Sequence, residues 1–130
     1  MNSLEILKKL VTIRDHKEGV FPAGQIPRVW TKSTAFVINT NDHTKPGTHW
    51  ICVYVDKKGV GCYFDSYGLP PIRPEYINRL RKNCKRYSWN TVQLQSETSN
   101  VCSHFCVMFL RCMSNGVSRK TFQKKFSADL

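Results

Sequence analysis

The sequence predicts an α+β domain in which a small, mostly antiparallel sheet packs on a central buried helix. Three observations support this fold class. The stretch at 101–113, VCSHFCVMFLRCM, is apolar on all sides, so we expect a central helix there rather than a surface one. Segments rich in β-branched and aromatic residues cluster between 34 and 65. Amphipathic helical patterns lie on both sides of these segments.

The first half of the chain is expected to form one helix followed by most of the sheet. Leucines recur at helical spacing behind Ser3, which predicts a helix near 3–13. Two prolines and two glycines predict an ordered loop at 19–29. Strands are expected at 34–39, 48–55 and 60–65, the last two joined by the turn DKKG with Gly59 in a left-handed position.

The second half is expected to be mainly helical. A proline at the first helical position opens a helix at 74–86, with Ile77, Leu80 and Cys84 on one side. The alternating segment NTVQLQ predicts a further strand at 90–95. After the buried helix, Ser118 is a cap for a short basic helix that carries Phe122 and Phe126.

The composition is that of an ordinary soluble globular protein, with one domain spanning 1–130. The chain has 41% hydrophobic and 22% charged residues, and no apolar run approaches the roughly 18 residues that span a bilayer, so we expect no membrane association. The amino terminus is amphipathic and carries Glu5 and Asp15, which makes it a poor secretory signal and predicts an intracellular protein. Its six cysteines include no C-x-x-C pair, so we expect reduced thiols and no metal site.

Basic residues exceed acidic ones, 20 to 9, and give a net charge of +11. Clusters of such residues attract nucleic acids through counterion release, but they also occur as solvated helix faces, and both interpretations stay open. The first cluster comprises Arg79, Arg81, Lys82, Lys85 and Arg86, and the second comprises Arg111, Arg119, Lys120, Lys124 and Lys125.

The expected hairpin brings a histidine and an aspartate together. If 57–59 form a three-residue loop, Asp56 faces Val60 and paired residue numbers sum to 116. His49 then lies opposite residue 67, and His49 and Asp65 become diagonal neighbours on one face, with Cα atoms roughly 7–8 Å apart. An imidazole beside a carboxylate is the base and orienting acid of a nucleophilic triad.

Cys102 is the thiol best placed to be a nucleophile. The polar segment SETSN at 96–100 predicts that the apolar helix begins directly at Cys102, where the helix dipole and free N–H groups favour the thiolate. Cys106 lies a turn deeper and is expected to be an inert core thiol. The backbone N–H of Cys102 and the side-chain amide of Gln95, at the end of the preceding strand, would serve as oxyanion donors.

Four short motifs, in this order and spacing, resemble a known family. They are GTHW at 47–50, FDSYG at 64–68, LQS at 94–96 and VCSHFC at 101–106, and GVFPAGQIP at 19–27 fits as well. They look like the adenovirus-type cysteine endopeptidases (adenains), most of all the compact proteases of Polinton/Maverick elements and related large DNA viruses.

The resemblance implies a cysteine protease with the papain-like/ubiquitin-like-protease-type architecture. It implies cleavage of polypeptides, mainly precursors of viral or element-encoded structural proteins, at Gly-containing sites. A host nucleus or a virion would then be the setting. The implied roles are general base for His49, orienting acid for Asp65, nucleophile for Cys102, oxyanion-hole amide for Gln95 and pocket-forming tryptophan for Trp50.

The resemblance also implies activators and contains one departure. Adenovirus enzymes are stimulated by DNA and by a basic peptide linked to a cysteine. By resemblance, the two basic clusters would bind DNA and Cys84 would be the thiol that links the peptide. The resemblance also implies a monomer that requires no cofactor. Ser103 stands where the family usually has glycine, and it is expected to border the substrate. Two other functions therefore remain: an isopeptidase acting on ubiquitin-like modifiers, and a catalytically weakened DNA-binding or partner-binding domain.

Overall fold

The computed structural model describes residues 2–11, 13, 16–22, 24–30, 33–40, 49–91, 93–94 and 102–127. In chain order the elements are α1 (Ser3–Leu10), β1 (Lys17–Pro22), β2 (Thr34–Asn39), β3 (Trp50–Val55), β4 (Val60–Phe64), α2 (Pro74–Asn83), β5 (Arg86–Trp89), α3 (Cys102–Ser114) and α4 (Arg119–Ser127). The predicted α+β class is confirmed. None of the described helices is long and apolar enough to cross a membrane.

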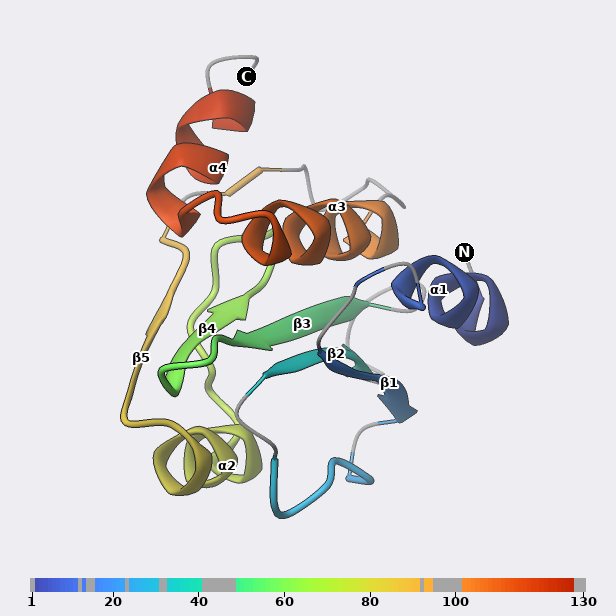
Figure 1. Cartoon of the computed structure of the whole chain (residues 1–130), viewed down its shortest axis with the longest axis vertical. Helices are drawn as coiled ribbons and strands as arrows, with labels where there is room; N and C mark the ends of the chain where they lie inside the picture. The colour runs from blue at the N-terminus through green and yellow to red at the C-terminus, as the bar shows by residue number, and fades with distance from the viewer. Residues whose placement is uncertain are drawn as a thin grey trace.

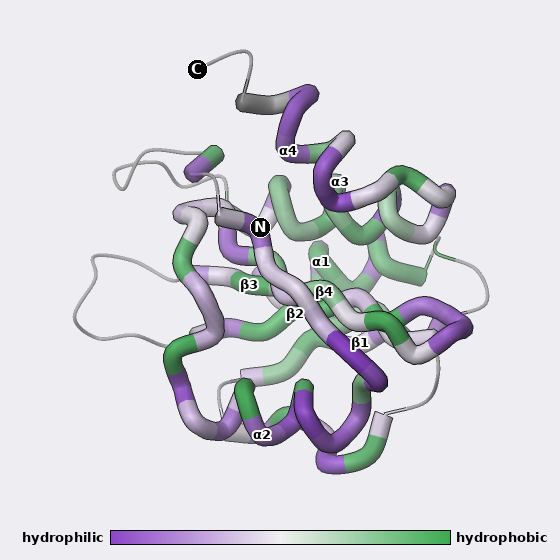
Figure 2. Tube along the Cα trace, turned by 90° about the vertical axis from the view of Figure 1, so that its left-hand side faces the viewer, coloured by the Kyte–Doolittle hydropathy of each residue, from purple (hydrophilic) through white to green (hydrophobic). Residues whose placement is uncertain are grey.

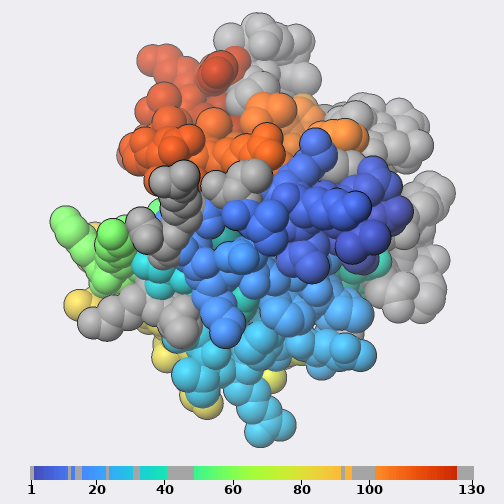
Figure 3. Space-filling model, turned by 45° about the vertical axis from the view of Figure 1, so that its right-hand side comes forward, coloured from blue at the N-terminus to red at the C-terminus, as the bar shows by residue number. Residues whose placement is uncertain are grey.

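The sheet is mixed, with five strands in the order β1-β2-β3-β4-β5. The central pairs β2–β3 and β3–β4 are antiparallel, and each edge strand pairs in parallel with its neighbour. Helices α1, α3 and α4 lie on one face of the sheet, and α2 lies on the other (Figure 1). On the surface shown in Figure 3, α1 (dark blue) lies against α3 (orange).

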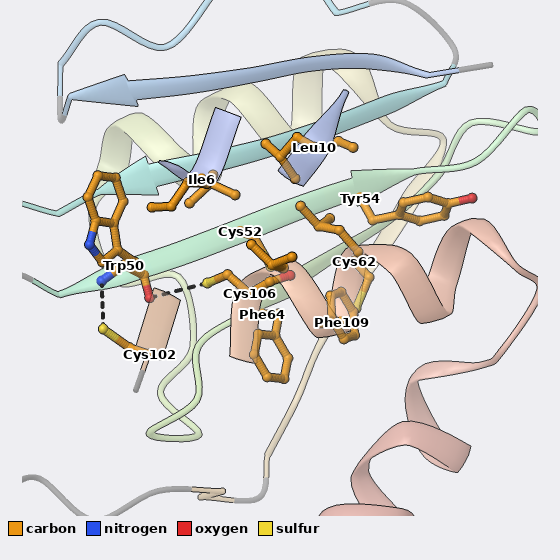
Figure 4. Close-up of a cluster of buried hydrophobic side chains, with 14 of the residues drawn as sticks. Ile6, Leu10, Trp50, Cys52, Tyr54, Cys62, Phe64, Cys102, Cys106 and Phe109 are labelled. Carbon is orange, nitrogen blue, oxygen red and sulfur yellow. Dashed lines mark hydrogen bonds between the residues drawn. The ribbon is translucent and has the colours of Figure 1, made fainter. Parts of the chain in front are cut away.

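β3 is the centre of the molecule because it is apolar on both faces, which is typical of a strand covered on both sides. Trp50, Cys52 and Tyr54 point into the core beneath α1 and α3 (Figure 4). The alternate residues of β3 pack in a second core with Tyr76 and Leu80 of α2. Hydrophobic positions gather accordingly in the inner strands and α3, while α4 is mainly hydrophilic (Figure 2). Both ends of β3 are thereby held rigidly in place.

The β3–β4 hairpin has the predicted register. Cys52 pairs with Phe64 and Tyr54 with Cys62, and Asp56 N donates to Val60 O at 3.0 Å across the three-residue loop. Gly59 closes the loop with φ of 84°, a left-handed conformation that favours glycine.

Several sequence predictions differ from the structure. The helix expected near 3–13 ends at Leu10, and the sheet expected to be mostly antiparallel is mixed, because both edge strands pair in parallel. Two further differences concern the positions of the edge strands. The segment expected as a loop at 19–29 begins inside β1, where Gly19 and Pro22 are tolerated because β1 is at an edge of the sheet. The strand expected at 90–95 is instead β5 at 86–89, and α2 consequently ends at Asn83 rather than at 86. Short parallel edge strands show little alternation of polar and apolar residues. The segment at 90–95 alternates more strongly than the true strand at 86–89 and is therefore predicted in its place.

We predict that Phe122→Ala lowers the free energy of unfolding by about 3–5 kcal/mol. Phe122 anchors α4 by packing edge-on against Phe64 and Phe109, with ring centroids 5.5 and 5.3 Å away. Denaturant unfolding measures the loss, with Leu4→Ala on the exposed face of α1 as the control, expected within about 0.5 kcal/mol of the wild type. Similar losses in the two variants would contradict this packing.

Candidate active site

His49 and Asp65 form a buried pair where β3 begins and β4 ends. His49 immediately precedes β3 and Asp65 immediately follows β4, so the hairpin register brings them to the same end of the sheet. His49 Nε2 and Asp65 Oδ1 are 2.9 Å apart. The diagonal relation predicted from the sequence is confirmed by this contact.

Backbone and side-chain contacts hold Asp65 in place from three directions. Tyr67 N donates to Asp65 Oδ1 at 2.8 Å, and Gly68 N donates to Asp65 O at 2.8 Å. Asn90, which is fully buried, accepts from Asp65 N at 2.9 Å and donates from Nδ2 to Asp65 O at 2.6 Å. Asn90 follows β5, so the edge strand carries the amide that fixes the backbone of Asp65.

The ring of Tyr67 stacks on one face of the His49 imidazole. The two rings are stacked at 4.4 Å between centroids and 19° between planes. Since Tyr67 also donates its backbone N–H to Asp65, one residue orients both members of the pair. An imidazole held on its face and at Nε2 keeps Nδ1 directed to one place.

Cys102 reaches this pair from the other side of the sheet. It is the first residue of α3 and is buried. Trp50 N donates to Cys102 Sγ at 3.4 Å, and Cys106 Sγ, one turn later, donates to Trp50 O at 3.5 Å (Figure 4). The two thiols therefore hydrogen-bond to the backbone N–H and C=O of Trp50. These bonds hold the start of α3 against the start of β3, next to His49.

The imidazole and the thiol shift each other's ionisation. Burial alone would lower the pKa of His49, but the hydrogen bond with Asp65 and contact with the Cys102 thiol outweigh it and raise this pKa from 6.5 to about 9. Burial alone would raise the pKa of Cys102, but His49 and the N–H groups of Trp50 and Ser103 outweigh it and lower this pKa below its usual value. His49 Nδ1 is buried and has no hydrogen-bond partner at good geometry within the described part of the chain.

Cys102 is chemically distinct from the other cysteines. It is the one whose pKa is lowered. Burial raises the pKa of Cys52 well above its usual value, that of Cys62 to about 12 and that of Cys84 to about 11, and it raises the pKa of Cys106 as well. Among these five thiols, Cys102 is therefore the one that the surroundings favour as a thiolate.

Other residues singled out in the sequence lie at varying distances from this centre. Trp50 is in the core with its backbone at Cys102, and Ser103 is 1% exposed in the first turn of α3. Gln95 lies outside the described residues. Cys84 immediately follows α2, is partly buried and packs over Gly61.

The two basic clusters are carried by different elements. Arg79, Arg81 and Lys82 are on α2, and Lys85 and Arg86 follow it, whereas Arg119, Lys120, Lys124 and Lys125 are on α4 and Arg111 is on α3. Helices α2 and α4 cover opposite faces of the sheet, and β5, which carries Arg86, lies at the edge between them (Figure 1).

Asn90 is the contributor to the site that sequence reasoning missed. Its segment was expected to be a strand, and nothing in the local pattern indicates that a side chain after an edge strand meets the backbone of Asp65. Tyr67, by contrast, could be found, because the hairpin register places residue 67 opposite His49.

Comparison with known proteins establishes the fold. No family model matches the chain, and no curated protein matches it. Two crystal structures of the ASFV pS273R protease are similar to it, the selenomethionine form with 24% identity and a TM-score of 0.55 over 70% of this chain and 38% of that one. The other has 21% identity and a TM-score of 0.57, over 70% and 36%. The chain thus spans little more than a third of the ASFV protein's length and has a cysteine-protease fold of the papain-like/ubiquitin-like-protease type.

We predict that Asn90→Ala lowers the pKa of His49 from about 9 toward 6.5, because Asp65 loses two hydrogen bonds to its backbone and its carboxylate is then held less firmly beside the ring. Nuclear magnetic resonance titration of the His49 ring measures the shift and needs no substrate. Asn83→Ala is the matched control, since Asn83 also bridges backbone groups, at Arg28 and Trp30, away from the site. An equal shift in both variants would show a general loss of stability instead.

Proposed function

We propose that this chain is a thiol endopeptidase in which Cys102 is the nucleophile, His49 the general base and Asp65 the orienting acid. The observation that carries the proposal is the contact between a buried His–Asp pair and the thiol whose pKa is lowered, at the start of a helix. The fold shared with the ASFV pS273R protease supports the same conclusion.

The geometry supports a complete acyl-transfer cycle. His49 Nε2 stays on Asp65, so Nδ1 is free to take the proton of the thiol and form an ion pair with the thiolate. The thiolate attacks the peptide carbonyl, the C–N bond breaks, and the leaving amine takes the proton from Nδ1. Water, deprotonated by His49, then attacks the thioester and releases the acid and the free thiol.

The oxyanion of the tetrahedral intermediates needs donors close to the nucleophile. In our proposal, the N–H of Cys102 supplies one and the side-chain amide of Gln95 the other. Ser103 was expected from the sequence to border the substrate, but its side chain is enclosed in the protein and only 1% exposed.

The motif resemblance supports a narrower proposal for the substrate. It favours polypeptide precursors of viral or element-encoded structural proteins, cut at Gly-containing sites. No cofactor takes part in the cycle above. Stimulation by DNA through the α2 or α4 cluster is part of this narrower proposal, because most of these basic side chains are exposed.

We predict that Cys102→Ala lowers peptide cleavage by roughly 10³-fold or more and abolishes labelling by an alkylating agent at slightly acidic pH. Cys106→Ser is the matched control, one helical turn away. It should retain both properties, because the hydroxyl can still donate to Trp50 O and the Cys106 thiol that it replaces is buried with a raised pKa. Cleavage is followed with a fluorogenic peptide library and labelling by mass spectrometry. Equal loss in the two variants would disprove the assignment of Cys102.

We predict a bell-shaped dependence of kcat/KM on pH. Activity should rise as Cys102 ionises, below the usual thiol value, and fall as His49 loses its proton near pH 9. Asp65→Asn should move the alkaline limb to lower pH, because the hydrogen bond with Asp65 raises the pKa of His49. Initial rates from about pH 4 to 10.5 test this. An alkaline limb at the same pH in Asp65→Asn would exclude Asp65 as the orienting acid.

A further inference from the structure

A pocket of about 220 Å³ adjoins the His49–Asp65 pair on the face of the sheet that α2 covers. Its other described lining residues are Thr40 after β2, Tyr63 of β4, Leu69, Pro70, Ile72 and Arg73 before α2, and Tyr76 in the first turn of α2. Neither Cys102 nor Trp50 is among its described lining residues. Whatever enters this pocket would contact the pair from the side opposite the nucleophile.

The inner part of the pocket presents hydrogen-bond donors. Tyr76 is 4% exposed, lines the pocket, and its hydroxyl has no hydrogen-bond partner at good geometry within the described part of the chain. Burial raises the pKa of Tyr76, so the group remains a hydroxyl at neutral pH. Arg73 lies 5.7 Å over the Tyr76 ring while its Nη2 donates to Thr40 O at 2.7 Å. The Tyr76 hydroxyl and the Arg73 guanidinium therefore lie side by side, and the hydroxyl can donate to an acceptor on a ligand.

The charge of the lining favours an anionic acceptor. Asp65 Oδ1 already accepts from His49 and from Tyr67 N, so its charge is compensated within the pair. Arg73 then leaves the lining with one net positive charge. The net charge of +11 on the whole chain also attracts acidic segments of a polypeptide.

The mouth of the pocket is apolar. Leu69 and Ile72 are 37% and 69% exposed, and Pro70 lies between them along the same wall. Exposed aliphatic side chains around a polar interior suit a ligand with a methylene stem and a charged end. Among amino-acid side chains, glutamate has this combination, and its size is compatible with the cavity.

The position of the pocket indicates which part of a substrate would reach it. In the proposed cycle, His49 protonates the leaving amine, so the polypeptide on the carboxyl side of the cleaved bond must pass over His49. A pocket bordered by His49, with Cys102 absent from its described lining, lies on that side. We propose that this pocket is a substrate subsite that takes a glutamate side chain from one of the first residues after the cleaved bond, bound by Tyr76 and Arg73. This inference rests on the proposed function.

The first test measures which residues the enzyme prefers after the cleaved bond. A peptide library is digested with the wild-type protein, and new amino termini are read by mass spectrometry. Peptides are then made from one cleaved sequence, varied at each of the first three positions after the bond to Glu, Gln, Leu or Lys. At one position, Glu should exceed Gln in kcat/KM by roughly tenfold. Absence of a Glu preference at every position would overturn the inference.

Variants of the pocket connect that preference to named residues. Tyr76→Phe removes only the hydroxyl and should lower kcat/KM for the Glu peptide about tenfold but for the Leu peptide less than about twofold. Arg73→Gln should abolish the preference for Glu over Gln. The controls Tyr87→Phe and Arg28→Gln make the same chemical changes outside the pocket lining and should retain it. Equal losses for all peptides in Tyr76→Phe would contradict a role in recognition.

A binding measurement separates failure of the subsite from failure of catalysis. N-acetyl-glutamate N-methylamide is titrated into the Cys102→Ala protein while the ring resonances of Tyr76 and His49 are followed, with the glutamine analogue for comparison. Saturable shifts that are weaker with glutamine and absent from Tyr76→Phe would support the pocket even if no peptide is cleaved. If no peptide is cleaved and no shift occurs, the subsite is rejected together with the enzyme.

Discussion

The candidate site depends on the register of the β3–β4 hairpin. Asp56 Oδ1 accepts from the backbone N–H groups of Lys58 and Val60, both at 2.9 Å, and Gly59 adopts the left-handed conformation that closes the loop. Side chains alternate between faces along a strand, so a slip of one residue would send His49 and Asp65 to opposite faces. Four residues at one end of the hairpin thus determine whether a base and its acid meet at the other end.

The contact between these two side chains depends on surroundings that bury the pair and fix its position. A buried carboxylate is costly unless it is paired and hydrogen-bonded, and here Asp65 has both the imidazole and a backbone N–H as donors. Asn90 adds two bonds to the backbone of the same residue, which makes the short edge strand β5 part of the site's support. The strand β5, which has the weakest sequence pattern, therefore positions the side chain that fixes the backbone of Asp65.

The two cores on either side of β3 separate two kinds of chemistry around one histidine. On the face covered by α3, His49 has the thiol whose pKa it lowers, in a setting suited to nucleophilic attack. On the face covered by α2, the same pair borders a pocket with a guanidinium and a hydroxyl but no described thiol. In our proposal, nucleophilic attack occurs on one side of the His49 imidazole and recognition of the leaving segment on the other. This arrangement fits a substrate chain that passes over His49.

Local patterns in the sequence determine much of this protein. Turn chemistry at 56–59 and alternation in the two flanking strands predict the hairpin, and hence the His49–Asp65 contact, because both are set by neighbours in the chain. The apolar stretch after SETSN likewise predicts where α3 begins, at Cys102. The tertiary structure alone decided the rest: the parallel edge strands, the reach of Asn90 to Asp65, and the pocket between α2 and the pair. These features join segments that lie 17 or more residues apart or on separate layers, and no periodicity within either segment records which partner it will meet.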